Sequence, residues 1–411
     1  MTISHWRFSP SPETVHTDAV VVGAGICGIA AALAFERRGM RAAVVERGTI
    51  AGGASGRNAG FLMRGAADHY ADAIRLYGRE RARQVWKWTE DNLADLRREG
   101  IEELPSYRRI PSALLALNEK QAEELRLSTA LLREDEFEVE WVTEGDDSVF
   151  GNRGNGVLGA LVNPNDASIN PIHMVRHLAG KLKGTVYENE PVLDIAPHTS
   201  HSTHDGGLVA VRTPARTFVS PRVLLATNAY APLLIPSLSA LVTPRRGQMF
   251  ALRNASDAAG RRPLRLAYSY YANYGSEYLR QTADGTVVIG GCRTYFAGRE
   301  IGYEDVTTDW VQRALESFAS RLLGAAFSAD DITTRWSGVM GFSPDGLPLV
   351  GPLPEFPAGN VWFCGGFTGH GMSMGFRTAT AAVAGMVEGA ANPFKMSRCV
   401  ERVTHSTPRP S

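Results

Sequence analysis

Short apolar runs separated by glycine-rich turns open the chain and predict a parallel β-sheet. Residues 19–22 (AVVV) form a run that suits a buried strand, and residues 42–45 (AAVV) form a second one. Between them, residues 29–38 are rich in alanine, which favours a helix that ends at Gly39. We therefore expect a strand–helix–strand unit whose two strands are parallel and buried.

The middle of the chain has the pattern of amphipathic helices. Leucine, valine and tryptophan recur at helical spacing in residues 69–100, and residues 118–133 repeat the pattern with a solvated face. Residues 166–183 begin with capping residues and carry Pro171 in the first turn. Residues 107–117 alternate like a strand, and residues 208–219 predict a hairpin that turns near Pro214.

The second half of the chain alternates apolar and polar residues, as antiparallel strands do. The clearest segments are GQMFALR, LRLAYSYY, SEYLRQT and GTVVIGG, within residues 241–293, with a turn at residues 283–285. A helix is expected over residues 309–323, and a buried strand over 361–364 precedes a last helix over 372–388. The pattern predicts an α/β chain with a Rossmann-like domain and a separate α+β block with an antiparallel sheet.

A glycine motif connects the first predicted strand to the first helix. Gly23, Gly25 and Gly28 have the spacing G-x-G-x-x-G, which permits a tight turn, close approach of a pyrophosphate and close packing of the helix on the strand. The helix N-terminus then offers N–H groups to the phosphates. Glu46 ends the second strand, where a carboxylate can accept from ribose hydroxyls and would repel a 2′-phosphate, so FAD or NAD is favoured over NADP. We assign dinucleotide contacts to Gly23, Ala24, Gly25, Ile26, Cys27, Gly28, Glu46 and Arg47.

Two further glycine-rich loops follow predicted strands. The small residues of residues 48–60 (GTIAGGASGRNAG) would let the backbone pass close to a flat ligand, although a surface loop without a ligand is the alternative. Residues 365–371 (GGFTGHG) lead into the last helix, whose N-terminus could hold the negative charge of a reduced flavin. In the first of these loops, Ser55, Arg57 and Asn58 supply a hydroxyl, a cation and an amide for contact with a cofactor.

Composition excludes several classes of protein. The 411 residues suggest two or three domains, and the equal numbers of basic and acidic residues, 43 each, do not indicate a nucleic-acid partner. No apolar run reaches about 18 residues, so we expect no membrane span. The cysteines Cys27, Cys292, Cys364 and Cys399 form no close pair, which predicts free thiols in a reducing cytoplasm and no metal site. His198, His201 and His204 recur in a polar run, which we interpret as a solvated loop.

With these motifs placed, the chain resembles the D-amino-acid-oxidase-like FAD oxidoreductases, a family that includes glycine, sarcosine and γ-glutamylputrescine oxidases. The matching pieces run from residue 18 to about residue 390: VVVGAGICGIAAA, GASGRNAGF, DASINP, LLATNAY, RWSGVMGFSPDGLPLVG and GFTGHGMSMGF. The pieces GASGRNAGF and GFTGHGMSMG together look most like the γ-glutamylputrescine oxidase branch.

The resemblance implies a discontinuous two-domain fold. Residues 1–85, 151–235 and 332–411 would form the FAD domain, and residues 86–150 and 236–331 an antiparallel-sheet substrate domain. Val192 would lie near the adenine, and Asn228 would follow a strand of the FAD domain. The resemblance also implies cofactor contacts by the two glycine loops, at Ser55, Gly56, Arg57, Asn58, Ala59, Gly60, Gly366, Gly369, His370, Gly371 and Met372. Some sarcosine oxidases bind flavin through a cysteine in the segment that resembles residues 335–351. This chain has no cysteine there, so we expect noncovalent FAD.

The resemblance also implies an activity: oxidation of an amine, or of an N-substituted or D-amino acid. Hydride would pass from the carbon next to nitrogen to flavin N5, the imine would hydrolyse, and oxygen or another acceptor would reoxidise the flavin. The expected partners are thus a small-molecule amine or amino acid and an electron acceptor, and the sequence does not specify the oligomeric state. The alternatives are a flavin-binding subunit of a multi-subunit dehydrogenase and an FAD monooxygenase.

Three residues, Arg280, Tyr278 and His370, are candidates for a catalytic role. Arg280 is a possible carboxylate clamp, and Tyr278 shares its face of the strand, unless both side chains face solvent. Arg246 and Gln248 are a second possibility for the clamp. His370 either contributes a hydrogen bond near the flavin or has a structural role.

Overall fold

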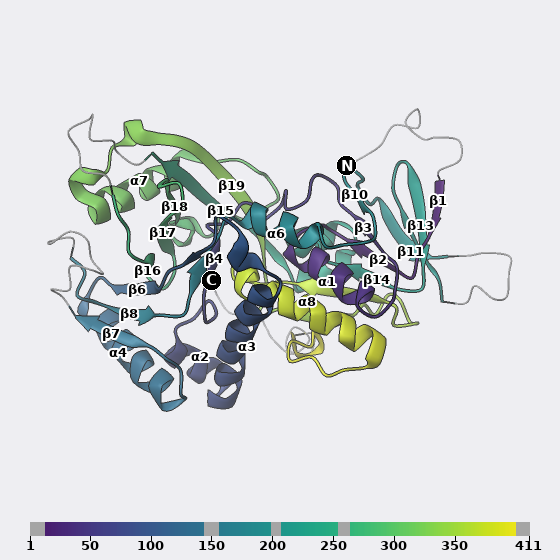
Figure 1. Ribbon diagram of the computed structural model, residues 1–411, viewed down its shortest axis with the longest axis horizontal. Helices are drawn as coiled ribbons and strands as arrows, with labels where there is room; N and C mark the ends of the chain where they lie inside the picture. The colour runs from purple at the N-terminus through teal and green to yellow at the C-terminus, as the bar shows by residue number, and fades with distance from the viewer. Residues whose placement is uncertain (1–12, 144–155, 199–206, 254–263, 400–411) are drawn as a thin grey trace. The chain divides into compact units, whose positions relative to one another are not determined.

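The computed structural model describes residues 13–143, 156–198, 207–253 and 264–399 (Figure 1). Two compact units divide the chain, and each is assembled from segments that are distant in sequence. The first unit contains residues 1–56, 175–244 and 340–411, and the second contains residues 57–174 and 245–339. The domain segments inferred from the sequence differ from this division chiefly because residues 57–85 and 151–174 group with the second unit.

A six-stranded sheet forms the centre of the first unit. Its strand order is β10-β3-β2-β14-β21-β20, in which the first five strands are parallel and β20 is antiparallel to β21. Every residue of β2 and β3 is buried, as their unbroken apolar runs predict. The strands are β2 (Ala19–Val22), β3 (Ala42–Val45), β10 (Val186–Tyr187), β14 (Val223–Leu225), β20 (Leu349–Pro352) and β21 (Val361–Gly365).

Two helices of this unit, α1 (Ile26–Glu36) and α8 (Gly371–Glu388), lie beside each other (Figure 1). A Cβ at Gly375 would lie 3.0 Å from Cys27 Sγ and 3.1 Å from Ile26 Cγ2, so the glycine lets α8 approach the first turn of α1. Both helices begin earlier than the sequence pattern predicted, α1 by three residues and α8 by one.

A smaller sheet completes the first unit. Its order is β1-β13-β12-β11, and the hairpin expected around Pro214 is confirmed as the antiparallel pair of β12 and β13. The strands are β1 (Glu13–His16), β11 (Asp194–Pro197), β12 (Val209–Arg212) and β13 (Arg216–Ser220). Helix α6 (Pro171–Ala179) starts at the predicted proline but ends before residue 183.

An eight-stranded sheet organises the second unit, in the order β19-β15-β18-β17-β16-β6-β8-β7. The predicted turn at residues 283–285 is confirmed, since β17 and β18 pair antiparallel on either side of it. The strands are β6 (Ser112–Ala116), β7 (Glu140–Thr143), β8 (Gly159–Asn163), β15 (Thr243–Leu252), β16 (Ser269–Ala272), β17 (Glu277–Gln281), β18 (Val287–Gly291) and β19 (Ile332–Phe342).

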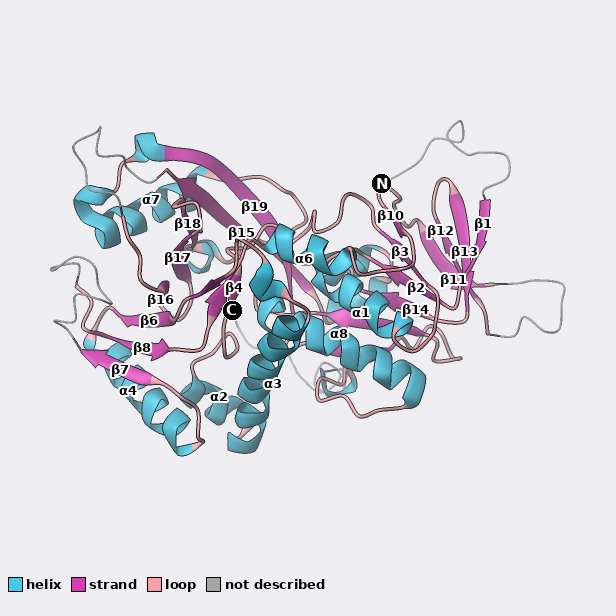
Figure 2. Cartoon of the chain, in the orientation of Figure 1, coloured by secondary structure: helices cyan, strands magenta, loops and turns pink. Residues whose placement is uncertain are grey.

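The two faces of this sheet have different surroundings. Helix α7 (Asp309–Leu323), which the sequence predicted with the same bounds, packs on one face, where Phe250, Leu279 and Ile289 are buried (Figure 2). On the other face, Tyr271, Tyr278 and Val288 are only partly buried and pack around Met249. Side chains alternate along a strand, so neighbouring residues of β17 belong to different faces.

Among the described residues of the second unit, the other α-helices are α2 (Tyr70–Tyr77), α3 (Arg79–Arg98) and α4 (Glu119–Glu134). The single helix expected over residues 69–100 is wrong, because Gly78 adopts a φ of 82° and separates α2 from α3. The helix expected from residue 118 is confirmed, and the Asn118 side chain caps it by accepting the Gln121 N–H at 3.0 Å.

A three-stranded sheet anchors the end of the first long glycine loop in the second unit. Strand β9 (Ala167–Ser168) pairs with both β4 (Phe61–Leu62) and β5 (Arg108–Arg109). The single strand expected over residues 107–117 is instead β5 followed by β6, with Pro111, which has no N–H to donate, between them.

A buried carboxylate lies directly before β9. Asp166 is 3% exposed, and it accepts hydrogen bonds from the Arg64 N–H at 3.0 Å and the Ser112 hydroxyl at 2.5 Å. Burial raises its pKa to about 6, against the smaller effects of Ser112 and Arg64, which lower it. The proton therefore binds more tightly in the folded protein than in the unfolded chain.

We expect this carboxyl group to make folding less favourable as the pH rises from about 4 to 6, since the folded state then retains a proton that the unfolded state has lost. Asp166→Asn should remove that dependence and stabilise the protein at pH 7 by about 2 kcal/mol relative to the parent. Urea unfolding of both proteins at pH 4 and 7 measures the difference, in which the other titrating groups cancel. Identical pH profiles would contradict the prediction.

Candidate functional site

The turn between β2 and α1 requires glycine at the three motif positions. Gly23 adopts a φ of +103°, which L side chains rarely adopt. A Cβ at Gly28 would lie 1.7 Å from the Gly23 carbonyl oxygen, and one at Gly25 would lie 2.8 Å from Ser55 Oγ. The tight turn and the close packing of α1 expected from the sequence are both present.

The first turn of α1 is arranged to receive an anion. Gly25 supplies no capping side chain, and the first turn contains no acidic residue. The Ile26 N–H donates to Ser55 Oγ at 3.0 Å, which places one predicted residue of the loop against the predicted turn. A phosphate fits such a helix start, because the N–H groups and the helix dipole both favour negative charge.

Glu46 lies at the carboxyl end of β3, and backbone groups hold its carboxylate. Its Oε2 accepts the Ala24 N–H at 2.8 Å, and its Oε1 accepts the Gly48 N–H at 2.9 Å. Each oxygen can accept a further bond, as a ribose hydroxyl would require. The guanidinium of neighbouring Arg47 lies 3.8 Å from the centroid of the Tyr230 ring, and Val192 packs partly buried against the core of the first unit.

The second glycine loop of the first unit is tied to the end of β14. Asn228, at a φ of 46°, accepts the Gly366 N–H on its side-chain oxygen at 2.9 Å. At the start of α8, His370 donates from Nδ1 to the Thr368 carbonyl at 3.1 Å, and the first turn contains no acidic residue. The assigned residues Gly369, Gly371 and Met372 all lie at this helix start, which also favours negative charge.

The part of the first glycine loop in the second unit, residues 57–60, is held by side chains from elsewhere in that unit. Arg57 forms an ion pair with Asp305 and donates to the Ser337 carbonyl at 3.1 Å. The Arg57 guanidinium therefore binds groups of the protein. Asn58 accepts the Gly60 N–H on its side-chain oxygen at 2.7 Å. The remaining assigned loop residue, Gly56, is the last residue of the first segment of the first unit.

Arg280 and Tyr278 share a face of β17, as alternation predicts. Arg280 is 3% exposed, and its Nε and Nη2 donate to the carbonyls of Ala59 and Ile169. Burial lowers the pKa of the guanidinium to about 10, with a contribution from Arg108, so it stays charged at neutral pH. Its role as a substrate clamp stays a prediction, but two of its three nitrogens are already used by backbone carbonyls.

Tyr278 belongs to an aromatic cluster on the same face. Its ring centroid lies 6.0 Å from that of Phe61 and 5.8 Å from that of Tyr271. Burial raises the pKa of the Tyr278 hydroxyl to about 12. The hydroxyl is therefore protonated at neutral pH and can donate a hydrogen bond, but it cannot act there as a base.

The second possible clamp, Arg246 with Gln248, is directed elsewhere. Glu300 is 1% exposed, and its Oε2 accepts from Arg246 Nε at 2.7 Å and Gln248 Nε2 at 2.9 Å. Despite burial, these bonds hold the pKa of Glu300 below its ordinary value. Gln248 also bonds to Thr308 and Gln312 at the start of α7, so this network fastens the helix to its face of the sheet.

Two absences concern the described residues alone. In the part of the chain that the structure describes, no group of three or more His, Cys, Asp or Glu side chains could hold a metal ion. His201 and His204 lie outside those residues, whereas His198 lies within them. None of the helices described is both long and apolar enough to cross a membrane.

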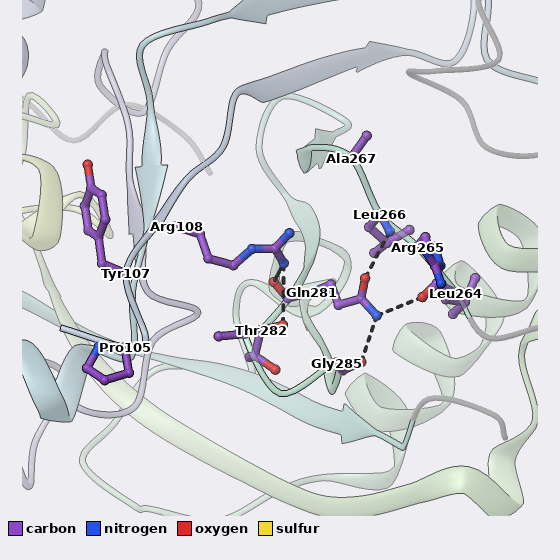
Figure 3. A pocket seen from close by; sticks show the side chains of 11 residues that line it. Pro105, Tyr107, Arg108, Leu264, Arg265, Leu266, Ala267, Gln281, Thr282 and Gly285 are labelled. Carbon is purple, nitrogen blue, oxygen red and sulfur yellow. Dashed lines mark hydrogen bonds between the residues drawn. The ribbon is translucent and has the colours of Figure 1, made fainter. Parts of the chain in front are cut away.

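A groove of about 620 Å³ opens on the second unit near the β17–β18 turn (Figure 3). Arg108 donates there to the Gln281 carbonyl at 3.0 Å, and the Gln281 amide donates to the carbonyls of Leu264 and Gly285. These bonds join three segments of the unit. The polar groups of Arg108 and Gln281 thus bond to the walls of the groove. None of the predicted site residues lines it.

Sequence reasoning missed the residues that support the loops. The backbone N–H of Ile169 donates to the Gly60 carbonyl, and the Trp336 indole donates to the Arg57 carbonyl at 3.0 Å. Ile169 lies in the segment DASINP and Trp336 in the segment RWSGVMG, both of which carry the family resemblance, but no support of a loop was assigned to either residue. The glycine required at position 60, whose Cβ would lie 1.9 Å from the Ile169 carbonyl oxygen, is the signal that a backbone passes there.

Comparison with known proteins gives consistent matches over most of the chain. A family described as FAD dependent oxidoreductase matches residues 18–384. The chain is 26% identical to gamma-glutamylputrescine oxidoreductase of Escherichia coli over 94% of its own length and 87% of that protein. It is 26% identical to glycine oxidase of Pseudomonas aeruginosa over 85% of its length and 88% of that protein. The crystal structure of glycine oxidase from Geobacillus kaustophilus superposes with a TM-score of 0.73 at 20% identity, covering 93% of this chain and 98% of that one.

The geometry of the first turn predicts that Gly28 does not tolerate a side chain. In Gly28→Ala the new Cβ meets a backbone oxygen that cannot move without opening the turn, so bound dinucleotide per soluble chain should fall more than about tenfold. Gly180→Ala is the matched control, since the atoms nearest to its Cβ, the carbonyl oxygens of Arg176 and His177, lie 3.5 Å away, an ordinary contact. Dinucleotide content of the purified proteins is the measurement. Equal content in the two variants would show that the turn does not depend on this contact.

Proposed function

The chain belongs to the family of FAD-dependent oxidoreductases, and from this premise we propose that it oxidises an amine or an N-substituted or D-amino acid. Two of its relatives are named for γ-glutamylputrescine and for glycine, and both compounds carry an amine. The observation that carries the proposal is the match of the family over residues 18–384, which includes both glycine loops and the strand with Arg280.

The residues of the first unit fit FAD. The turn at Gly23–Gly28 leaves room for a pyrophosphate at the start of α1, and Glu46 presents a carboxylate fixed by two backbone N–H groups to a ribose. We propose that Ala24, Ile26, Cys27, Arg47, Ser55, Gly56 and Val192 contribute to the nucleotide end. The start of α8, with Gly366, Gly369, His370, Gly371 and Met372, is proposed to contact the flavin, supported by Asn228.

When bound, FAD supplies the acceptor for a hydride from the carbon next to the substrate nitrogen, and water hydrolyses the resulting imine. The partly buried face with Tyr271, Tyr278 and Val288 is the proposed contact for the substrate. Because the Tyr278 hydroxyl is protonated at neutral pH, it can orient a substrate but does not take its proton. The substrate amine would therefore bind in its neutral form.

Oxygen or another acceptor is proposed to regenerate the oxidised cofactor. A cytoplasmic location is also part of the proposal, and the support for it is that Cys27, Cys292, Cys364 and Cys399 are free and buried.

The mode of FAD attachment has a direct test. We expect noncovalent binding, because each of the four thiols is buried and residues 335–351 contain no cysteine. Precipitation of the purified yellow protein with acid should leave the colour in the supernatant. Yellow colour that stays with the washed pellet would contradict this.

The proposed reaction predicts that an amine alone reduces the bound cofactor. Purified protein with FAD is mixed without oxygen with γ-glutamylputrescine, glycine, sarcosine and D-amino acids, and the visible flavin absorbance is recorded. At least one compound should bleach it, and admission of oxygen should restore the colour with release of hydrogen peroxide if oxygen is the acceptor.

Two controls separate the alternatives. Gly28→Ala protein, which should lack the dinucleotide, must give no bleaching with the same compounds. Recovery of colour only with a dye acceptor would identify a dehydrogenase or a subunit of one. Bleaching by NADPH and by none of the amines would overturn the proposal in favour of a monooxygenase.

A further inference from the structure

Three backbone carbonyls of the loop at residues 57–60 each accept a hydrogen bond from a different residue. The Trp336 indole donates to the carbonyl of Arg57 at 3.0 Å, Arg280 Nε donates to that of Ala59, and the Ile169 N–H donates to that of Gly60 at 2.9 Å. These donors come from three separate segments of the second unit. The loop conformation is therefore imposed from outside the loop.

The peptide between Ala59 and Gly60 is held at both ends. Its carbonyl oxygen accepts from Arg280, and its N–H donates to the Asn58 side chain at 2.7 Å. Because a trans peptide is planar, these two bonds fix the direction of the whole group. Gly60 adopts a φ of 74°, and a Cβ there would lie 2.7 Å from Arg280 Nη2, so the guanidinium occupies the space that a side chain would need.

Arg280 is an unusual choice for a merely structural contact. It is 3% exposed, and among the residues that the structure describes no carboxylate forms an ion pair with it. Burying a charge without a counter-ion is costly unless hydrogen bonds compensate it, and here the carbonyls of Ala59 and Ile169 accept hydrogen bonds from the guanidinium. Arg246, the buried arginine on the other face, instead pairs with Glu300.

We propose that Arg280 is a positioning residue, which holds the Ala59–Gly60 peptide in the conformation that receives the flavin. The role rests on the proposed function and on the contact with FAD that the sequence predicts for residues 57–60. It replaces the clamp for a substrate carboxylate, which could use only the N–H groups that the two carbonyls leave over. It also predicts an effect on cofactor binding when no substrate is present.

Arg280→Met tests the role, because the side chain keeps its bulk and loses every donor. The dissociation constant of FAD for the apoprotein, measured by flavin fluorescence, should rise at least about tenfold, which corresponds to the loss of one or two hydrogen bonds to a charged group. The visible spectrum of the bound flavin should shift as well. Arg280→Lys, whose ammonium can reach fewer carbonyls in the same plane, should give an intermediate constant.

Arg246→Met is the matched control, since it removes a second buried arginine of the same sheet and unit. It removes the ion-pair partner of Glu300 and should lower the melting temperature, yet the FAD dissociation constant should stay within about twofold of the parent. If Arg280→Met is insoluble, the FAD dissociation constant of Arg280→Lys is compared with that of Arg246→Met instead.

Two results would overturn the role. FAD constants and spectra that match the parent in Arg280→Met and Arg280→Lys, with a raised KM for acidic substrates alone, would restore the clamp and leave the proposed function intact. Equal weakening by the Arg280 and Arg246 variants would reduce Arg280 to a stability contact. Failure of the parent protein itself to bind FAD would instead overturn the proposed function, and this role with it.

Discussion

Close approach of bare backbone is the constraint on which this structure depends. The helix α1 can pack on β2 only because residue 28 is a glycine. A Cβ there would lie 1.7 Å from the Gly23 carbonyl oxygen. The same packing aligns the start of α1 with the carboxyl ends of β2 and β3, where Glu46 is held by two N–H groups. Removing side chains thus creates the place where a charged, flat ligand can be bound by peptide groups.

The second unit orients the peptide groups of a loop by other means. Its loop at residues 57–60 also needs a glycine, but the surrounding unit fixes the loop through an arginine, an indole and a backbone N–H. In the first unit, regular structure orients the peptide groups, because a helix start always presents its N–H groups in the same direction. An irregular loop has no such rule, so dedicated side chains must supply the orientation.

This difference explains what the sequence could predict. The parallel strands, the hairpin at residues 283–285 and α7 follow from local periodicity, and each was found close to its true bounds. The glycine motif and Glu46 could be assigned because strand, turn and helix repeat one geometry in many proteins. The interruption at Gly78 was missed, because an amphipathic pattern continues across a glycine that may or may not break a helix.

The roles of the two arginines could not be predicted from the sequence, and the reason is physical. Arg246 and Arg280 both lie on strands with alternating patterns, and both are buried. Their difference lies in partners far away in the sequence: a carboxylate for Arg246, and two carbonyl oxygens for Arg280. A carbonyl leaves no mark on the sequence, since every residue has one. The glycine at position 60 was the one local sign that an arginine and a backbone segment converge there.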